Sequence, residues 1–201
     1  LVFLLVLIVA PVVALAGGPD LSAAKTDDVG GQATLNEEFT WTIVIENLAD
    51  EYTTSFGLPW FVDNLPGTGV TYGVLTTTLS GGASGDPACS LTADPTIGCV
   101  GAVTLPTGGK VTLEVPVTPT AVGALTNPRS GGSCLVQFIT GDTNSGNDTC
   151  SNSVVVSTGA TGPDLTVVNT NDVGGATELA AGPFTWTLQV GNGGETSATF
   201  T

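Results

Sequence analysis

The chain has 201 residues, of which eighteen are acidic and three are basic, so its formal net charge at pH 7 is −15. A field this negative repels nucleic acid and anionic headgroups, and we expect no nucleic-acid partner. The chain contains no histidine, which excludes Ser-His-Asp catalysis and His-ligated zinc or copper. Thr, Val, Gly, Ser, Asn and Asp are abundant, as is typical of strands joined by turns. We therefore predict an all-β protein that is not an enzyme.

Residues 1–16, LVFLLVLIVAPVVALA, form an uncharged apolar run. The small residues Ala14 and Ala16 before Gly17 match a signal-peptidase site, so the run is predicted to be the h-region of a secretory signal, with its basic n-region missing. The alternative is a membrane anchor, which needs about 20 apolar residues, and Pro11 interrupts this run. The signal predicts export and a location outside the cell or on its surface.

Short segments of alternating apolar and polar residues, separated by turn-forming residues, predict the strands of a β-sandwich. The clearest is 39–46, in which Phe39, Trp41, Ile43 and Ile45 share one face and should enter the core. Pro116 has no N–H for a ladder, so its strand is expected to be an edge or to contain a bulge there. The predicted strands are residues 21–26, 39–46, 56–62, 70–77, 89–92, 97–102, 110–117, 134–140 and 153–157.

An internal repeat predicts the domain organisation. PDLSAAKTDDVGGQATL, from residue 19, and PDLTVVNTNDVGGATEL, from residue 163, are identical at nine of 17 positions with an offset of 144 residues. The FTWT motif at 39–42 returns at 184–187. A unit of this length suits a sandwich module rather than a solenoid coil. We predict a complete repeat over 19–157, a linker over 158–162 and a truncated start of a second repeat over 163–201.

The chain has four cysteines, Cys89, Cys99, Cys134 and Cys150, an even number that favours disulfides in an exported protein. Of the three possible connectivities we choose Cys89–Cys99 and Cys134–Cys150, because each pair brackets a segment rich in turn residues. Closing each short loop is worth about 3 kcal/mol in the chain-entropy model. Four buried free thiols are the alternative.

Four further segments carry a family resemblance: FTWTIVIENLADE, DNLPGTGVTY, LPTGGKVTLEVPVTPTAVGALTNP and NSGNDTCSNSVVV. In this order, around the first cysteine pair, they resemble the conserved repeat domain of bacterial and archaeal cell-surface proteins, and more loosely the cell-adhesion-related domain found in bacteria (CARDB). The resemblance implies a tandem array of immunoglobulin-like Greek-key β-sandwiches that holds functional parts away from the cell. It carries over no catalytic residues. The second cysteine pair and the loop over 80–87 depart from the pattern and leave the strand order open.

Two groups of oxygen-bearing side chains are candidate calcium sites. Asp142, Asn144 and Asp148 alternate along one loop, but that loop lacks the glutamate that closes an EF-hand and suits an Asx turn. Asp27, Asp28 and Asp172 form the second group and lie near the predicted module joint. We favour turns and solvated loops at both places, and so expect no cofactor.

Other functions rest on weaker patterns. Glycoside hydrolysis needs two opposed carboxylates, and the sequence assigns no partner to Glu37, Glu38, Glu46, Glu51 or Glu114. Trp60 and Tyr72 could line a sugar-binding surface, although aromatic residues among aliphatic ones usually pack in a core.

The sequence favours a secreted or cell-surface structural or adhesive module that acts as a spacer or stalk. The alternatives are a carbohydrate-binding module with exposed aromatics, and an extracellular filament subunit that keeps its apolar N-terminus. Expected partners are neighbouring repeats of the same chain and a cell-surface protein or glycan. The acidic excess also suits a salt-rich habitat.

Overall fold

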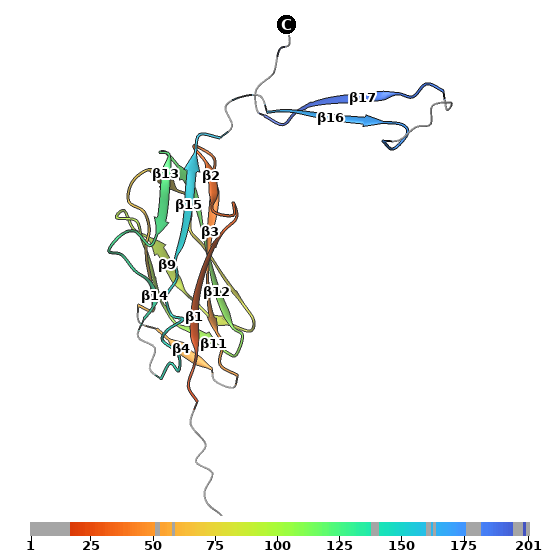
Figure 1. The fold of residues 1–201 in the computed structure, drawn as a ribbon. Coiled ribbons are helices and arrows are strands. Elements are labelled where there is room, and N and C mark those ends of the chain that lie inside the picture. The colour runs from red at the N-terminus through yellow and green to blue at the C-terminus, as the bar shows by residue number, and fades with distance from the viewer. Residues whose placement is uncertain are drawn as a thin grey trace, which may run out of the picture.

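The structure is a computed structural model that describes residues 17–50, 53–57, 59–137, 141–159, 162, 164–175, 182–194 and 199. These residues form seventeen β-strands and no helix, in an open arrangement of several sheets (Figure 1). Among them there is accordingly no helix long and apolar enough to cross a membrane. The predicted signal segment, 1–16, lies outside the described residues. The all-β sandwich predicted from the sequence is confirmed.

One layer of the sandwich is an antiparallel sheet built around three long strands. β3 (Phe39–Asn47) lies between β1 (Leu21–Asp27) and β12 (Lys110–Pro119), and two short strands, β6 (Val70–Tyr72) and β7 (Thr76–Ser80), pair with the other edge of β12. The alternation of β3 predicts its buried face correctly. Every second residue from Phe39 to Asn47 points into the core, and Trp41 is fully buried.

The facing layer consists of two smaller sheets. β14 (Cys134–Val136), β5 (Phe61–Asn64), β10 (Thr96–Val100) and β9 (Ala88–Leu91) form one of them. β13 (Gly123–Asn127), β15 (Asn152–Ser157) and β2 (Gln32–Thr34) form the other, in which β2 runs parallel to β15. A third small sheet of β4 (Thr54–Phe56), β11 (Val103–Leu105) and β8 (Ser84–Gly85) lies near the end at which the chain enters (Figure 1).

Three predicted strands are divided or shorter in the structure. The segment 56–62 was expected to be one strand, but β4 ends at Phe56 and β5 begins at Phe61. Gly57 and Pro59 interrupt the alternation, since proline cannot donate to a ladder and glycine has little strand preference. The predicted strand 97–102 ends early, because β10 stops at Val100, before Gly101 with its positive φ of 93°, and β11 begins only at Val103. In 134–140 only the first three residues form a strand, and 138–140 lie outside the described residues.

The sequence predicts an edge or a bulge in the strand of Pro116, but β12 pairs on both sides, and the irregularity lies in its neighbour, where 70–77 divides into β6 and β7. Tyr72 pairs with Val117 and Thr76 with Glu114, so residues 73, 74 and 75 oppose only residues 115 and 116. This count defines a bulge in the partner strand. Gly73 lies so close to Pro116 that an added Cβ would be 2.8 Å from the proline Cβ. Pro116 itself stays in register with Thr40 on its other side.

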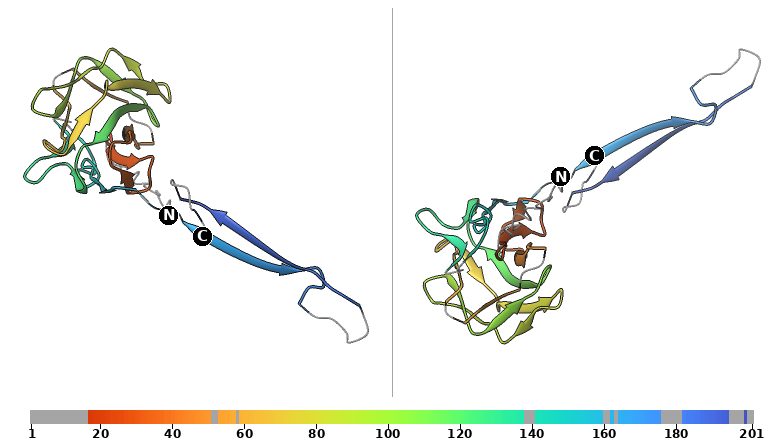
Figure 2. Two further views of the ribbon diagram at one scale, coloured as in Figure 1. Left: turned by 90° about the horizontal axis from the view of Figure 1, so that it is seen from above. Right: turned by 90° about the horizontal axis from the view of Figure 1, so that it is seen from below.

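Beyond the sandwich, β16 (Leu165–Asn171) and β17 (Trp186–Asn192) form a hairpin that extends away from it (Figures 1 and 2). Asn171 pairs with Trp186 as Asp27 pairs with Trp41 in the first hairpin. The apolar side chains of the β16–β17 hairpin are exposed, unlike those of β1 and β3. The matching register agrees with the predicted repeat, but the hairpin alone is not a second module, and the tandem array stays a prediction.

The chain enters and leaves the sandwich at opposite ends. β1 begins at the end that carries β4 and β11, and β15 finishes at the other end, from which the chain leads to the hairpin (Figure 1). β15 is the last strand of the sandwich in chain order. A pull on the two ends of this unit would therefore act along its long axis.

Candidate functional site

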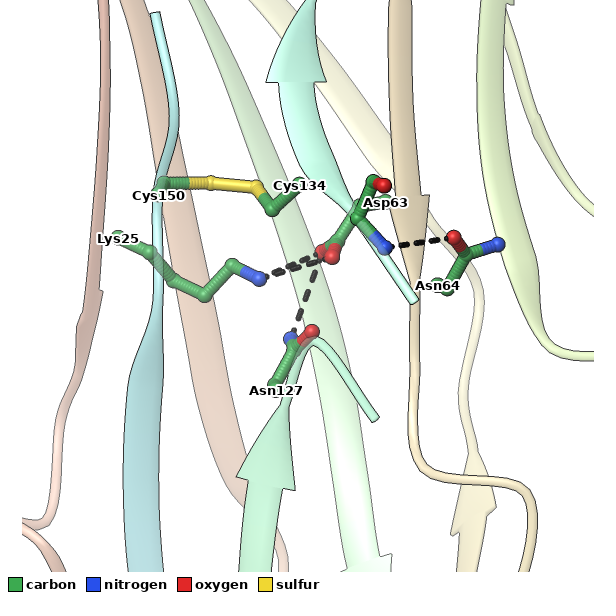
Figure 3. The surroundings of a disulfide bond; sticks show 7 residues. Lys25, Asp63, Asn64, Asn127, Cys134 and Cys150 are labelled. Atoms are coloured by element: carbon green, nitrogen blue, oxygen red, sulfur yellow. Dashed lines mark hydrogen bonds and ion pairs between the residues drawn. A yellow bond between two sulfur atoms is a disulfide. The ribbon is translucent and has the colours of Figure 1, made fainter. Parts of the chain in front are cut away.

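A buried cluster of polar side chains joins the layers of the sandwich. Lys25 Nζ lies 2.9 Å from Oδ1 and 2.8 Å from Oδ2 of Asp63, and neither side chain has any exposed surface. Asn127 Nδ2 donates to Asp63 Oδ2 at 3.4 Å, and Asn127 is also fully buried. Figure 3 shows the lysine amine and the asparagine amide converging on the one carboxylate. Strands from three sheets thus contribute to this one buried polar cluster.

Strand alternation forces these groups into the core. On β1 the inward positions are Leu21, Ala23 and Lys25, and on β5 the inward position after Phe61 is Asp63. Asp63 pairs with Ile97 on β10 and Cys134 on β14, both of which are buried, and Lys25 pairs with the buried Ile43 on β3. The Lys25–Asp63 ion pair therefore has apolar neighbours on both sides and little water around it.

Burial sets the electrostatics of this cluster. Removal from water lowers the pKa of Lys25 to about 8, although the charge of Asp63 and its hydrogen bond oppose the shift. Burial also raises the pKa of Asp63 above its ordinary value, against the opposing effects of Lys25 and Asn127. Both shifts favour the neutral forms. Within the described part of the chain, Asn127 Oδ1 is buried with no hydrogen-bond partner.

The first calcium candidate is a loop held by its own hydrogen bonds. Asp142 Oδ1 accepts from the backbone N–H of Asn144 at 2.8 Å, which makes an Asx turn, and its Oδ2 accepts from Leu21 N at 3.0 Å. Partial burial, together with the charges of Asp142 and Asp20, raises the pKa of Asp148 to about 6. The structure thus gathers Asp142, Asn144 and Asp148 in one loop. Calcium binding there, the less favoured alternative, stays untested.

The second calcium candidate is divided between two hairpins. Asp28 Oδ1 accepts from Thr40 N, and Asp172 Oδ1 accepts from Thr185 N in the β16–β17 hairpin, so the two residues have the same role in different places. Asp27 closes the turn after β1 by accepting from Gly31 N at 2.7 Å. Across the residues that the structure describes, no three Asp, Glu, His or Cys side chains are grouped as a metal site requires.

The cysteines lie in the two pairs chosen from the sequence. Cys89 and Cys99 are direct partners on β9 and β10, with their Cα atoms 4.1 Å apart. Cys134 and Cys150 join β14 to the segment before β15, with a Cα–Cα distance of 5.2 Å (Figure 3). The described residues include no free cysteine. The second bond lies directly beside Asp63, so it supports the strand that carries the buried carboxylate.

The candidate sugar-binding aromatics do not form an exposed platform. Trp60 is buried, with its ring centroid 4.9 Å from that of Phe56 and the two rings tilted, while Tyr72 is half-buried and donates its hydroxyl to Pro66 O at 2.7 Å. The candidate acids are also apart or otherwise engaged. Glu46 pairs with Lys110 at 3.0 Å and Glu114 accepts from Thr76. The other glutamates, Glu37 and Glu38, are exposed, and Glu51 lies outside the described residues.

Sequence reasoning missed the Lys25, Asp63 and Asn127 cluster. A signal was present, because Lys25 occupies an inward position of the alternating segment LSAAK, where a charge is unexpected. The partners lie 38 and 102 residues further along the chain, and no local pattern links them to Lys25. Only the packing of β1, β5 and β13 brings the three together.

No protein-family profile matches the chain, and a search of curated protein sequences found no match. Several solved structures are similar in fold. A crystal structure of a CARDB domain from Pyrococcus furiosus, in complex with di-metal ions, is 15% identical, with a TM-score of 0.39, over 69% of this chain and 89% of that one. A solution structure of the same domain is 14% identical, with a TM-score of 0.42, over 71% and 98%. A cohesin module of a family 33 glycoside hydrolase from Clostridium perfringens is 14% identical, with a TM-score of 0.38, over 67% and 96%.

Proposed function

We propose that the sandwich over 19–157 is an extracellular, non-catalytic module that acts as a spacer or stalk at a cell surface. The observation that carries this proposal is the entry and exit of the chain at opposite ends of the sandwich (Figure 1). Modules connected in this way add their lengths, whereas modules with adjacent termini would fold back on one another. The internal repeat in the sequence supports such a series.

Two further features suit a module outside the cell. Two disulfides link segments within one layer of the sandwich, and such bonds persist in oxidising compartments. The net charge of −15 keeps neighbouring copies apart and hydrated. Adhesion to a surface protein or glycan through the exposed loops is compatible with this role.

The carbohydrate-binding alternative has less support. A platform for sugar rings needs exposed aromatic side chains on one sheet, and Trp41 and Trp60 are both buried in the core. The filament alternative depends on residues 1–16, outside the described part of the chain. N-terminal sequencing of the mature protein tests it, since a start at Gly17 would leave no apolar segment to pack in a fibre.

Surface labelling of intact source cells tests the location. Antibodies raised against residues 17–159 should label cells before permeabilisation, while antibodies against a cytoplasmic protein should label them only afterwards. Labelling that needs permeabilisation would contradict the proposal.

Single-molecule pulling tests the spacer role. With handles at residues 17 and 159, a spacer should resist extension at low force, because the load passes through β1 and β15, which pair with β3 and β13 respectively. Gradual unravelling of the sheets at low force would contradict this role.

A further inference from the structure

We propose that Lys25 and Asn127 react to form an intramolecular isopeptide bond, with Asp63 as the acid–base catalyst. The bond would join the Lys25 side-chain nitrogen to Cγ of Asn127 and covalently link β1 to β13. This inference does not depend on the proposed spacer role.

The first argument is placement. Lys25 is one of only three basic residues in the chain, yet it lies in the core rather than on the highly acidic surface. Its amine has Asp63 as its close charged partner, and Asn127 hydrogen-bonds to that same carboxylate. A nucleophile, an amide and a carboxyl group are thus held together, away from water, by three rigid strands (Figure 3).

The second argument is the protonation state. An amine must be neutral to act as a nucleophile, and a carboxyl group must be protonated to polarise an amide carbonyl. Transfer of one proton from Lys25 Nζ to Asp63, across 2.8 Å, supplies both forms at once. Burial shifts the pKa of each group in the required direction.

The third argument concerns the amide orientation. Asn127 Nδ2 now faces Asp63 Oδ2, as suits an ionised carboxylate, and Oδ1 of the same amide is buried without a partner among the described residues. A half-turn about the Cβ–Cγ bond exchanges the two amide atoms. The carbonyl oxygen would then accept the proton of a neutral Asp63, which gives that orphaned acceptor a donor.

The chemistry balances without an oxidant or a cofactor. Neutral Nζ of Lys25 attacks Cγ of Asn127, the Nζ–Cγ bond forms, and Asp63 donates its proton to the carbonyl oxygen. Asp63 then takes a proton from Nζ and transfers it to Nδ2. The Cγ–Nδ2 bond breaks and ammonia leaves, and as the carbonyl reforms its hydroxyl returns the proton to Asp63, which ends protonated as it began.

Asn127 is the favoured acceptor rather than Asp63 itself. Attack on Asp63 would release water and consume the group that moves the protons. Asp63 is also ionised whenever it forms the ion pair with Lys25, and an ionised carboxylate is a poor electrophile, whereas the amide of Asn127 is neutral throughout. The two products differ in mass, so one measurement distinguishes them.

Mass spectrometry of the purified folded protein, after denaturation, reduction and alkylation, tests the proposal. The intact mass is expected to be lower than that of the alkylated sequence by one ammonia. The full sequence mass would overturn the proposal. Loss of one water would overturn the assignment of Asn127 as the acceptor.

Trypsin digestion localises the bond, because the chain has only three tryptic sites, after Lys25, Lys110 and Arg129. A linked Lys25 resists cleavage, so residues 111–129 should be found attached to the segment that ends at Lys110. Release of residues 26–110 as a separate peptide, with 111–129 unlinked, would overturn the proposal. This step also excludes ammonia loss through a succinimide at another asparagine.

Three variants separate a reaction from a purely structural role. Lys25→Arg keeps a positive charge for Asp63 but removes the amine nucleophile, and should restore the full mass. Asp63→Asn keeps the size of the side chain and should also restore it. Asn127→Asp should still link, with loss of water in place of ammonia. Retention of the ammonia loss in Lys25→Arg would overturn the assignment, and the wild-type measurement decides the case even if a variant fails to fold.

Discussion

The indole Nε1 of Trp41 on β3 donates to Oδ1 of Asn152 on β15 at 2.9 Å, which connects the two layers of the sandwich through one side chain. Asn152 Nδ2 in turn donates to Asp27 Oδ2 at 2.9 Å. This asparagine therefore satisfies a buried tryptophan and a turn carboxylate together.

Replacing Asn152 with alanine should lower the free energy of unfolding by about 1–3 kcal/mol, because the Trp41 N–H would lose its partner inside the protein. Urea denaturation followed by tryptophan fluorescence measures the loss. Ser153→Ala, one position along the strand and exposed, is the matched control and should be close to neutral. Equal stability of the two variants would show that the bridge has no energetic role.

Removing one partner of the buried ion pair should cost more than removing both. Lys25→Met leaves the carboxylate of Asp63 in the core without its cation, which typically costs about 3–5 kcal/mol. The double variant Lys25→Met with Asp63→Leu removes both desolvated groups and should recover part of that loss. Denaturation midpoints of the single and double variants measure the difference, and because both lack the Lys25 amine the comparison does not depend on a bond to Asn127. A double variant less stable than the single one would contradict the prediction.

Because of Asp148, the stability of the protein should depend on pH in the mildly acidic range. Its pKa is raised from 3.8 to about 6 in the folded protein, so the folded state binds this proton more tightly than the unfolded state. Its contribution to stability is therefore present below pH 4 and is lost as the pH rises from about 4 to about 6.

Asp148→Asn should remove that loss and raise the melting temperature at pH 7, relative to wild type, by relieving repulsion from Asp142 and Asp20. Thermal melts at a series of pH values measure the change. Asp86→Asn removes an exposed carboxylate elsewhere and is the control. A variant that melts below wild type at pH 7 would argue against this repulsion.

Calcium should have no specific effect on stability. Both carboxylate oxygens of Asp142 already accept backbone N–H groups, so the loop is formed without a cation. Melting temperatures with calcium, with chelator and with magnesium at equal ionic strength should separate specific binding from general screening of the net charge of −15. A rise with calcium well beyond that with magnesium would establish a calcium site.

The two disulfides should differ in their contribution. Cys134–Cys150 spans 16 residues and holds β14 against the segment before β15, and its loss should cost about 3 kcal/mol. Cys89–Cys99 joins strands that already pair in register, so its removal should cost less. Alanine pairs at each bond, compared by denaturation, measure both. A greater loss from the Cys89–Cys99 pair would contradict this ranking.

Much of the fold could be predicted from local patterns, because β3 and β12 alternate strictly and their inward residues are apolar except for Asn47 at the end of β3. Strands with weak or no alternation were missed, among them β2, β8 and β13. These segments form strands because they pair with their neighbours, and their own residues give little signal. The bulge opposite Pro116 could be expected, but its location in β6–β7 depends on sheet order. The polar cluster was missed because its members come from three sheets.

Because Lys25 is buried, the surface of the sandwich has very few amines that reagents can modify. Arg129 has no amine and is engaged with Asp94, so Lys110, whose side chain is 40% exposed, is the lysine within 17–159 that reagents can reach. Amine-directed dyes, crosslinkers or coated beads would therefore attach at Lys110 or at the amino terminus. Coupling through Lys110 would place the protein on a support in one fixed orientation.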